Sequence, residues 1–349
     1  MNNKEMLIRN SKEPLIIAET AFSHEGSVDY LKEMITNLRN QKNIAIKFQV
    51  LINKDDFLTD SNAIYSEIDK WMLSEEQWSE TIEFAYTNSV NVILAVLDRT
   101  AIEIAKKNKD KISAVEIHPS CIPDNRLLSE AIQFCNLEDI PLIIGVSGFE
   151  IKEMDYLMEN YMNNFDKDRL ILMYGFQNYP TRLSAVNLKR MRIYEKKYGV
   201  KVAYADHTEF DNEIKDHLVS MIYGMGVNIF ELHYVLEFGI DRIDYITAYD
   251  ASRIISLHDK LELLFTALGK EEEGMSDSEI EYSVKFRKIP VYYRDYCEGH
   301  TLKANDISFK RSTIKSDYTI YESDKLIGKT INKPVKKDQP ILKEEFRLI

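Results

Sequence analysis

Eight short apolar runs constrain the fold of this chain more than any other feature of its sequence. Each run is aliphatic or β-branched and nearly continuous, which is typical of strands that are buried on both faces. Polar stretches with helical periodicity separate them. In chain order the runs are LIIAE (15–19), IAIKFQV (44–50), VNVILAV (90–96), ISAVEI (112–117), PLIIGV (141–146), LILMYG (170–175), KVAYAD (201–206) and VNIFELH (227–233).

This alternation predicts an α/β fold in which eight parallel strands close into a (β/α)8 TIM barrel. A doubly wound open sheet is the rival, but such sheets usually have fewer strands and a glycine-rich first turn. The first turn here reads LIIAETAFSHEG and has no GxGxxG. We therefore expect a barrel domain over residues 1–270.

The sequence changes character after the barrel region. Residues 271–283 are polar and acidic, and we expect them to form a linker. Residues 284–349 contain short alternating segments, KFRKIPVYYRD, LKANDISFKRS and IGKTINKPVKKDQPIL, separated by turn-forming residues. This pattern predicts a second, small β-rich domain.

Composition excludes several classes of function. The formal net charge of -12 argues against a nucleic-acid partner, because phosphates would be repelled. No apolar run approaches the roughly 18 residues of a membrane span, and the N-terminus has no signal-peptide pattern. The cysteines, Cys121, Cys135 and Cys297, form no CxxC pair. We expect a cytoplasmic protein with reduced thiols.

Polar residues stand at the carboxyl ends of the predicted strands, where a buried core would not place them. A (β/α)8 barrel brings these ends together at one mouth, which is where its catalytic groups lie. The set therefore predicts an active site. Its members are Glu19, Lys47, Gln49, Glu116, Gln177, Asp206, His207, Glu231 and His233.

Two of these residues, His207 and His233, end the seventh and eighth predicted strands, which are neighbours in a barrel. Two imidazoles on adjacent strand ends can share a divalent cation. Glu19 comes beside the eighth strand when the barrel closes. The mixed nitrogen and oxygen ligands favour Mn²⁺, with Mg²⁺, Co²⁺ or Fe²⁺ as alternatives, over structural zinc.

Several segments, in order along nearly the whole chain, resemble the sialic acid (N-acetylneuraminate, or nonulosonic acid) synthase family. IIAETAFSHEG resembles the family's IIAEIGxNHxG, AIKFQ its VKFQ and QNYPTRLSAVNL its YPTPxxxVNL segment. ADHT resembles SDHT, and IFELHYVLEFGIDRID resembles the segment at the eighth strand. The C-terminal residues are similar to the family's antifreeze-like (SAF) domain. Each motif alone is degenerate, and the ordered set is specific.

The resemblance implies a metal-dependent transferase that condenses phosphoenolpyruvate with the open-chain aldehyde of an N-acyl-hexosamine. It implies His207 and His233 as metal ligands, and a domain-swapped homodimer in which Arg287 contacts the sugar's acyl group. The catalytic cluster would be Glu19, Lys47, Glu231 and Asp244, with Lys47 binding the anionic donor. The other substrate-binding residues would be Gln49, Glu116, Gln177 and Tyr179.

The family's phosphate-binding positions differ in this chain. Glu116 stands where the family has a lysine, and Ala95, Val146 and Ala205 stand where it has hydroxyl side chains. Replacing a cation by a carboxylate repels phosphate, unless Glu116 pairs with Lys47. Three outcomes stay open: a synthase with a repositioned phosphate site, a metal-dependent aldolase or lyase with another donor such as an unphosphorylated keto acid, and a non-catalytic sugar-binding or partner subunit.

Overall fold

The computed structural model describes residues 7, 12–175, 178–319 and 321–346. The chain divides into two compact units, Met1–Gly269 and Lys270–Ile349.

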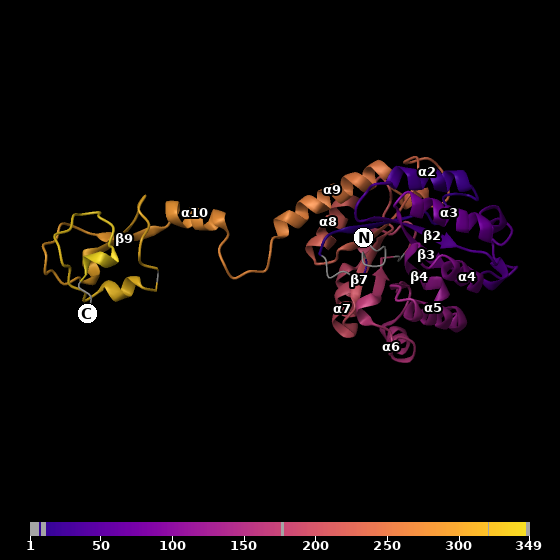
Figure 1. Ribbon diagram of the computed structural model, residues 1–349, viewed down its shortest axis with the longest axis horizontal. Coiled ribbons are helices and arrows are strands. Elements are labelled where there is room, and N and C mark those ends of the chain that lie inside the picture. The colour runs from indigo at the N-terminus through magenta and orange to yellow at the C-terminus, as the bar shows by residue number, and fades with distance from the viewer. Residues whose placement is uncertain (1–6, 8–11, 176–177, 320, 347–349) are drawn as a thin grey trace. The chain divides into compact units, whose positions relative to one another are not determined.

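The first unit, coloured from indigo to orange in Figure 1, contains the barrel. Its eight parallel strands form a closed sheet, each paired with the next and β1 paired with β8. The expected (β/α)8 barrel is confirmed, and all eight apolar runs form its strands. These are β1 (Leu15–Glu19), β2 (Ile44–Val50), β3 (Asn91–Val96), β4 (Ile112–Ile117), β5 (Leu142–Gly145), β6 (Leu170–Tyr174), β7 (Lys201–Asp206) and β8 (Ile229–His233).

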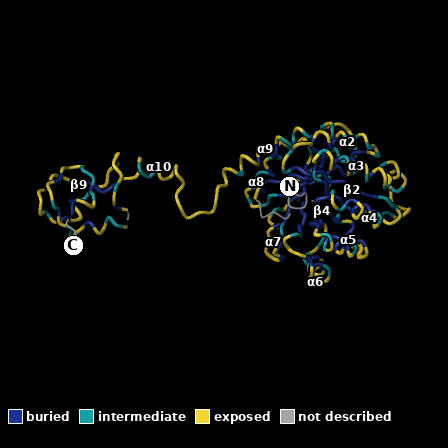
Figure 2. Tube along the Cα trace, viewed as in Figure 1, coloured by how far each residue is buried: buried dark blue, intermediate teal, exposed yellow. Residues whose placement is uncertain are grey.

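Helices surround the strands and present exposed residues on their outer side (Figure 2). They are α2 (Val28–Leu38), α3 (Glu75–Thr87), α4 (Arg99–Lys107), α5 (Asn125–Leu137), α6 (Ile151–Asn160), α7 (Met191–Tyr198), α8 (Lys215–Gly224) and α9 (Ala251–Leu268). Ser27, Ser74, Asp98 and Asp124 cap the first four by accepting backbone N–H groups. Across the described residues, no helix has the length and apolar character needed to cross a membrane.

Side chains alternate between the two faces of each barrel strand. On β1, Ile16 and Ala18 face the helices, whereas Ile17 belongs to a separate apolar cluster inside the barrel. Because the period of a strand is two, Glu19 follows Ile17 on the interior face. The interior is therefore apolar at the amino ends of the strands and becomes charged toward their carboxyl ends.

Gly175 lets β6 end close against β7. Its φ of +142° is a conformation that side chains rarely adopt, and a Cβ there would lie 2.0 Å from the Ala205 carbonyl oxygen. Only glycine fits this approach. The contact keeps Ala205 and the following His207 next to the end of β6.

The second unit contains helix α10 (Asp277–Phe286) and a two-stranded antiparallel sheet of β9 (Lys288–Tyr292) and β10 (Ile307–Arg311). α10 begins inside the stretch expected to be a linker, so residues 277–283 are helical. In the third expected strand segment, 327–342, the described residues form isolated bridges such as Thr301 to Thr330 and no continuous strand. Aromatic and aliphatic residues of β9 and of the chain from Tyr296 to Phe346 form its small core, to which α10 contributes none.

Candidate active site

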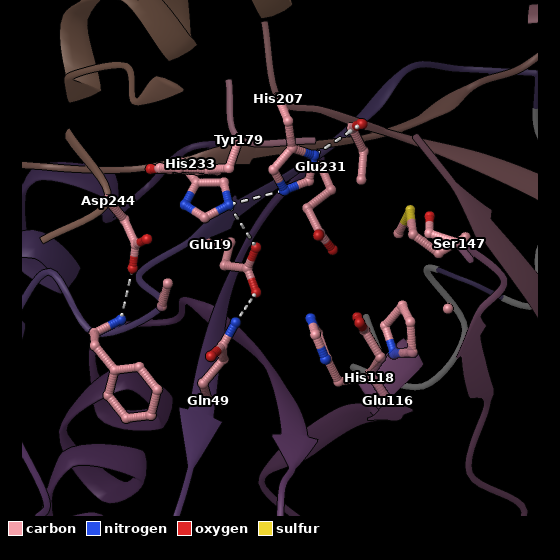
Figure 3. Close-up of a pocket in the computed structure, with 16 residues that line it drawn as sticks. Glu19, Gln49, Glu116, His118, Ser147, Tyr179, His207, Glu231, His233 and Asp244 are labelled. Atoms are coloured by element: carbon pink, nitrogen blue, oxygen red, sulfur yellow. Dashed lines mark hydrogen bonds and ion pairs between the residues drawn. The ribbon is translucent and has the colours of Figure 1, made fainter. Parts of the chain in front are cut away.

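The site lies inside the carboxyl end of the barrel, where strand register brings the charged positions together (Figure 3). Glu19 on β1 pairs in register with Lys47 on β2 and, on its other side, with His233 on β8. Glu231, two residues before His233, shares the interior face. The closed sheet therefore places these side chains next to one another without any contribution from long loops.

The Lys47 ammonium is the centre of a buried ion cluster. Its Nζ lies 2.9 Å from Glu19 Oε1, 2.7 Å from Glu116 Oε2 and 2.5 Å from Glu231 Oε2. All four side chains are almost fully buried. One positive charge thus faces three carboxylates, which leaves an excess of negative charge inside the barrel.

Burial and these charges together change the pKa values of the cluster. Burial favours the neutral form of Lys47, but Glu116, Glu19 and Glu231 outweigh it and hold the lysine pKa well above its usual range. Burial raises the pKa of Glu116, and burial together with the charge of Glu19 raises that of Glu231 well above its usual range. For Glu19, burial is opposed by Lys47 and His233, which keep its pKa low. Glu19 is therefore the strongest acid of the three.

Glu19, His207 and His233 form a group whose potential ligand atoms all lie within 4.8 Å of one another. The two Nε2 atoms are 3.0 Å apart, and His233 Nε2 is 3.4 Å from Glu19 Oε2. Burial and the neighbouring His233 lower the pKa of His207 well below its usual range, so this imidazole is neutral. Two imidazoles and one carboxylate are a donor set for a divalent cation.

The hydrogen bonding of His207 fits this role. Its Nδ1 lies 3.3 Å from the Ala205 carbonyl, which can only accept, so Nδ1 carries the proton. The Nε2 lone pair then points toward His233. Such a hydrogen bond from the far ring nitrogen is the usual support of a metal-binding histidine. The residues present therefore fit a metal ion.

Polar side chains lie on the side of the cavity next to His233. Gln49 Nε2 donates to Glu19 Oε1 at 2.9 Å, and Asp244 Oδ2 accepts from the Phe22 backbone N–H at 3.2 Å. The Tyr179 ring lies 5.7 Å from the His233 ring. Burial raises the pKa values of Tyr179 and Asp244. These groups can donate to and accept from hydroxyl groups of a ligand.

The opposite side of the cavity contains Glu116, His118 and Ser147 (Figure 3). Burial lowers the pKa of His118 to about 4, so its imidazole is neutral near pH 7. The cavity volume is about 200 Å³. None of its described lining residues is a lysine or arginine. They are Glu19, Ala21, Phe22, Gln49, Glu116, His118, Pro119, Gly145, Ser147, Met173, Tyr179, Ala205, His207, Glu231, His233 and Asp244.

The structure brings most of the predicted site residues to one place. Together at the mouth lie Glu19, Lys47, Gln49, Glu116, Tyr179, His207, Glu231, His233 and Asp244. Gln177 lies outside the described residues. Arg287 belongs to the second unit, where it follows α10. Asp206 does not line the cavity; it is buried beside Lys215 and Thr208.

Sequence reasoning missed several lining residues and the surroundings of Lys47. Phe22, Pro119, Gly145 and Met173 line the cavity, and their positions at or just after strand ends were the available signal. The pair of Lys47 with Glu116 was considered from the sequence, but its contacts with Glu19 and Glu231 were not. The structure shows that these partners surround its ammonium group.

Comparisons with known proteins agree with this architecture. A family model described as the NeuB family matches residues 31–273. The N,N'-diacetyllegionaminic acid synthase of Legionella pneumophila is 24% identical, covering 85% of each chain. The pseudaminic acid synthase of Campylobacter jejuni is 22% identical over 96% of this chain and 97% of its own. A solved Chromobacterium violaceum structure, named for spore coat polysaccharide biosynthesis protein E, has a TM-score of 0.80 at 19% identity, covering 96% of this chain and 100% of its own.

Proposed function

Since the chain belongs to the NeuB family, we propose that it is a metal-dependent synthase that joins a three-carbon donor to an open-chain sugar aldehyde. The acceptor class is an N-acyl-hexosamine-like sugar, and the product is a nonulosonic-type acid. The observation that carries the proposal is the buried group of Glu19, His207 and His233 at the barrel mouth. The names of the relatives, which are synthases of related acids, support the reaction type.

We propose that His207 and His233, with Glu19, hold a divalent metal ion, with Mn²⁺ as the first choice. When bound, such an ion supplies Lewis-acid polarisation of a carbonyl oxygen. The protein's own groups position the reactants. Tyr179, Asp244 and Gln49 would bind hydroxyl groups of the acceptor. They line the same cavity as the proposed metal ligands. Holding both reactants at one mouth lowers the entropic barrier of the condensation.

Lys47 would act from behind the cavity by stabilising charge on its three carboxylate partners. Its contacts hold Glu19 and Glu231 in place while keeping part of their negative charge neutralised. Preorganised charges of this kind need no rearrangement during the reaction. In this proposal Lys47 and Glu231 belong to the catalytic cluster.

We further propose that residues 284–349 are a SAF domain and that two chains form a domain-swapped homodimer. In that dimer, Arg287 of one chain would contact the acyl group of a sugar bound in the barrel of the other. The resemblance of residues 287–311 and 327–342 to the family's C-terminal domain supports this proposal.

The test combines metal content with product formation. Wild-type protein is incubated with Mn²⁺, N-acetylmannosamine and either phosphoenolpyruvate or pyruvate, and products are identified by mass spectrometry. We expect a nonulosonic acid product from one of the donors, and none after chelation. If the protein binds no metal and forms no product with either donor, the synthase proposal is wrong and a non-catalytic role gains support.

A further inference from the structure

We propose that the donor of this synthase is an unphosphorylated 2-keto acid of the pyruvate class, and that Glu116 sets this preference. This inference rests on the proposed function and specifies its donor. The donor would bind on the side of the cavity that contains Glu116, His118 and Ser147.

The charges around the cavity oppose a phosphorylated donor. Four carboxylates line it, those of Glu19, Glu116, Glu231 and Asp244, and no lysine or arginine does so among the described lining residues. Positions 176 and 177, outside the described residues, are phenylalanine and glutamine in the sequence. The ammonium group of Lys47, on the same strand as the lining residue Gln49, already contacts three carboxylates.

A phosphate group needs more positive charge than this side of the cavity offers. A phosphate monoester has a charge of about -1.5 to -2 near pH 7 and is usually bound by arginine, lysine or several N–H donors. Among the described lining residues, His118 is neutral, and Pro119, Gly145, Met173 and Ala205 are apolar. Lys47 contacts Glu116 Oε2 at 2.7 Å, but it does not line the cavity and its charge is shared with Glu19 and Glu231. A keto acid keeps one carboxylate and lacks the phosphate, so it is repelled far less.

His118 lines this side of the cavity with a neutral imidazole. Its Nδ1 accepts from the Ser120 backbone N–H at 3.3 Å and lies 2.7 Å from Ser120 Oγ. The imidazole proton is then on Nε2. In the proposed complex, this neutral Nε2–H would form a hydrogen bond with the keto or carboxylate oxygen of the keto acid.

The reaction needs a base, because a keto acid, unlike an enol phosphate, must first lose a proton from C3. Glu116 lines the cavity and is the carboxylate on the donor side. In the proposed step the C3–H bond breaks and its proton passes to Glu116. The electron pair forms the bond from C3 to the aldehyde carbon. The aldehyde oxygen takes a proton from water, and Glu116 returns its proton to water, so the product is a 4-hydroxy-2-oxo acid and no phosphate is released.

The experiment does not require knowledge of the sugar. Pyruvate is incubated with the full-length, metal-loaded protein in D₂O, and deuterium in the methyl group is measured by mass spectrometry. We expect exchange above the rate with metal alone. Glu116→Gln should lower the rate by about 100-fold or more, the usual contribution of a general base. The control is Glu130→Gln, a partly exposed carboxylate that forms an ion pair with Arg99, and it should exchange as wild type does.

Two further measurements separate the outcomes. ³¹P line broadening of phosphoenolpyruvate by the metal-free protein should be no greater in wild type than in Glu116→Gln. Absence of methyl exchange in the wild-type protein overturns the donor assignment. Phosphate release from phosphoenolpyruvate with N-acetylmannosamine also overturns it, while supporting the proposed synthase function. Failure of that function instead gives no product with either donor.

Discussion

Lys47 is the residue on which the charged interior of the barrel depends. Its ammonium is the counter-charge of Glu19, Glu116 and Glu231, all of them buried. Breaking a buried ion pair leaves charges that neither water nor a partner stabilises. The same cluster therefore serves the stability of the barrel and the proposed chemistry.

Replacing Lys47 by methionine keeps the length of the side chain and removes its charge. We expect the free energy of unfolding to fall by about 3–5 kcal/mol, the usual cost of leaving buried charges unpaired. Urea unfolding measures this. Lys32→Met is the control, because its partner Glu80 is 61% exposed, and such surface pairs contribute under about 1 kcal/mol. Equal effects of the two substitutions would contradict the central role of Lys47.

Sequence reasoning predicted the polar residues of the site but only some of their contacts. Glu19, His207 and His233 could be placed at strand ends, and neighbouring strands bring them together. The contact of Lys47 with Glu116 joins β2 to β4, which are not neighbours in the sheet. Contacts across the barrel interior depend on strand tilt and stagger, which the pattern of apolar runs does not encode.

At the scale of elements, the close approach of β6 and β7 positions His207, one of the proposed metal ligands. Gly175→Ala would put a Cβ 2.0 Å from the Ala205 carbonyl oxygen, so the backbone must shift. We expect a loss of about 1–3 kcal/mol of stability, as for other strained backbone positions, and weaker metal binding. Thermal unfolding and metal titration measure these effects.

Gly199→Ala is the matched control for Gly175→Ala. Gly199 also has a positive φ, of +64°, but a Cβ there meets nothing within 4 Å. It should cost about 1 kcal/mol at most and leave metal binding unchanged. If both variants bind metal as wild type does, the approach of β6 and β7 is not needed for the site.

The strands of the barrel could be predicted, whereas parts of the second unit could not. Buried strands have continuous apolar runs, and all eight were recognisable from them. α10 has no buried residue, so no packing against a core marks its position. Its local signal was the capping box of Ser276 and Glu279. Residues 327–342 form isolated bridges because their contacts follow turns rather than a continuous ladder.

At the scale of the whole molecule, the proposed homodimer makes Arg287 part of a site in another chain. Arg287→Ala should raise the KM for the sugar about 10-fold, as expected for the loss of one charge-assisted hydrogen bond. Light scattering should still give the mass of a dimer. Arg294→Ala is the control, because Arg294 is exposed in the same unit. A monomeric wild-type protein, or an unchanged KM, would contradict this assignment.

Metal content tests the central claim most directly. Wild type, His207→Ala, His233→Ala and the control His217→Ala, which changes an exposed histidine on α8, are loaded with Mn²⁺, dialysed and measured by mass spectrometry. We predict about one ion per chain in wild type and control. Both site variants should contain almost none while keeping the wild-type circular dichroism spectrum. Full metal content in either site variant would contradict the account.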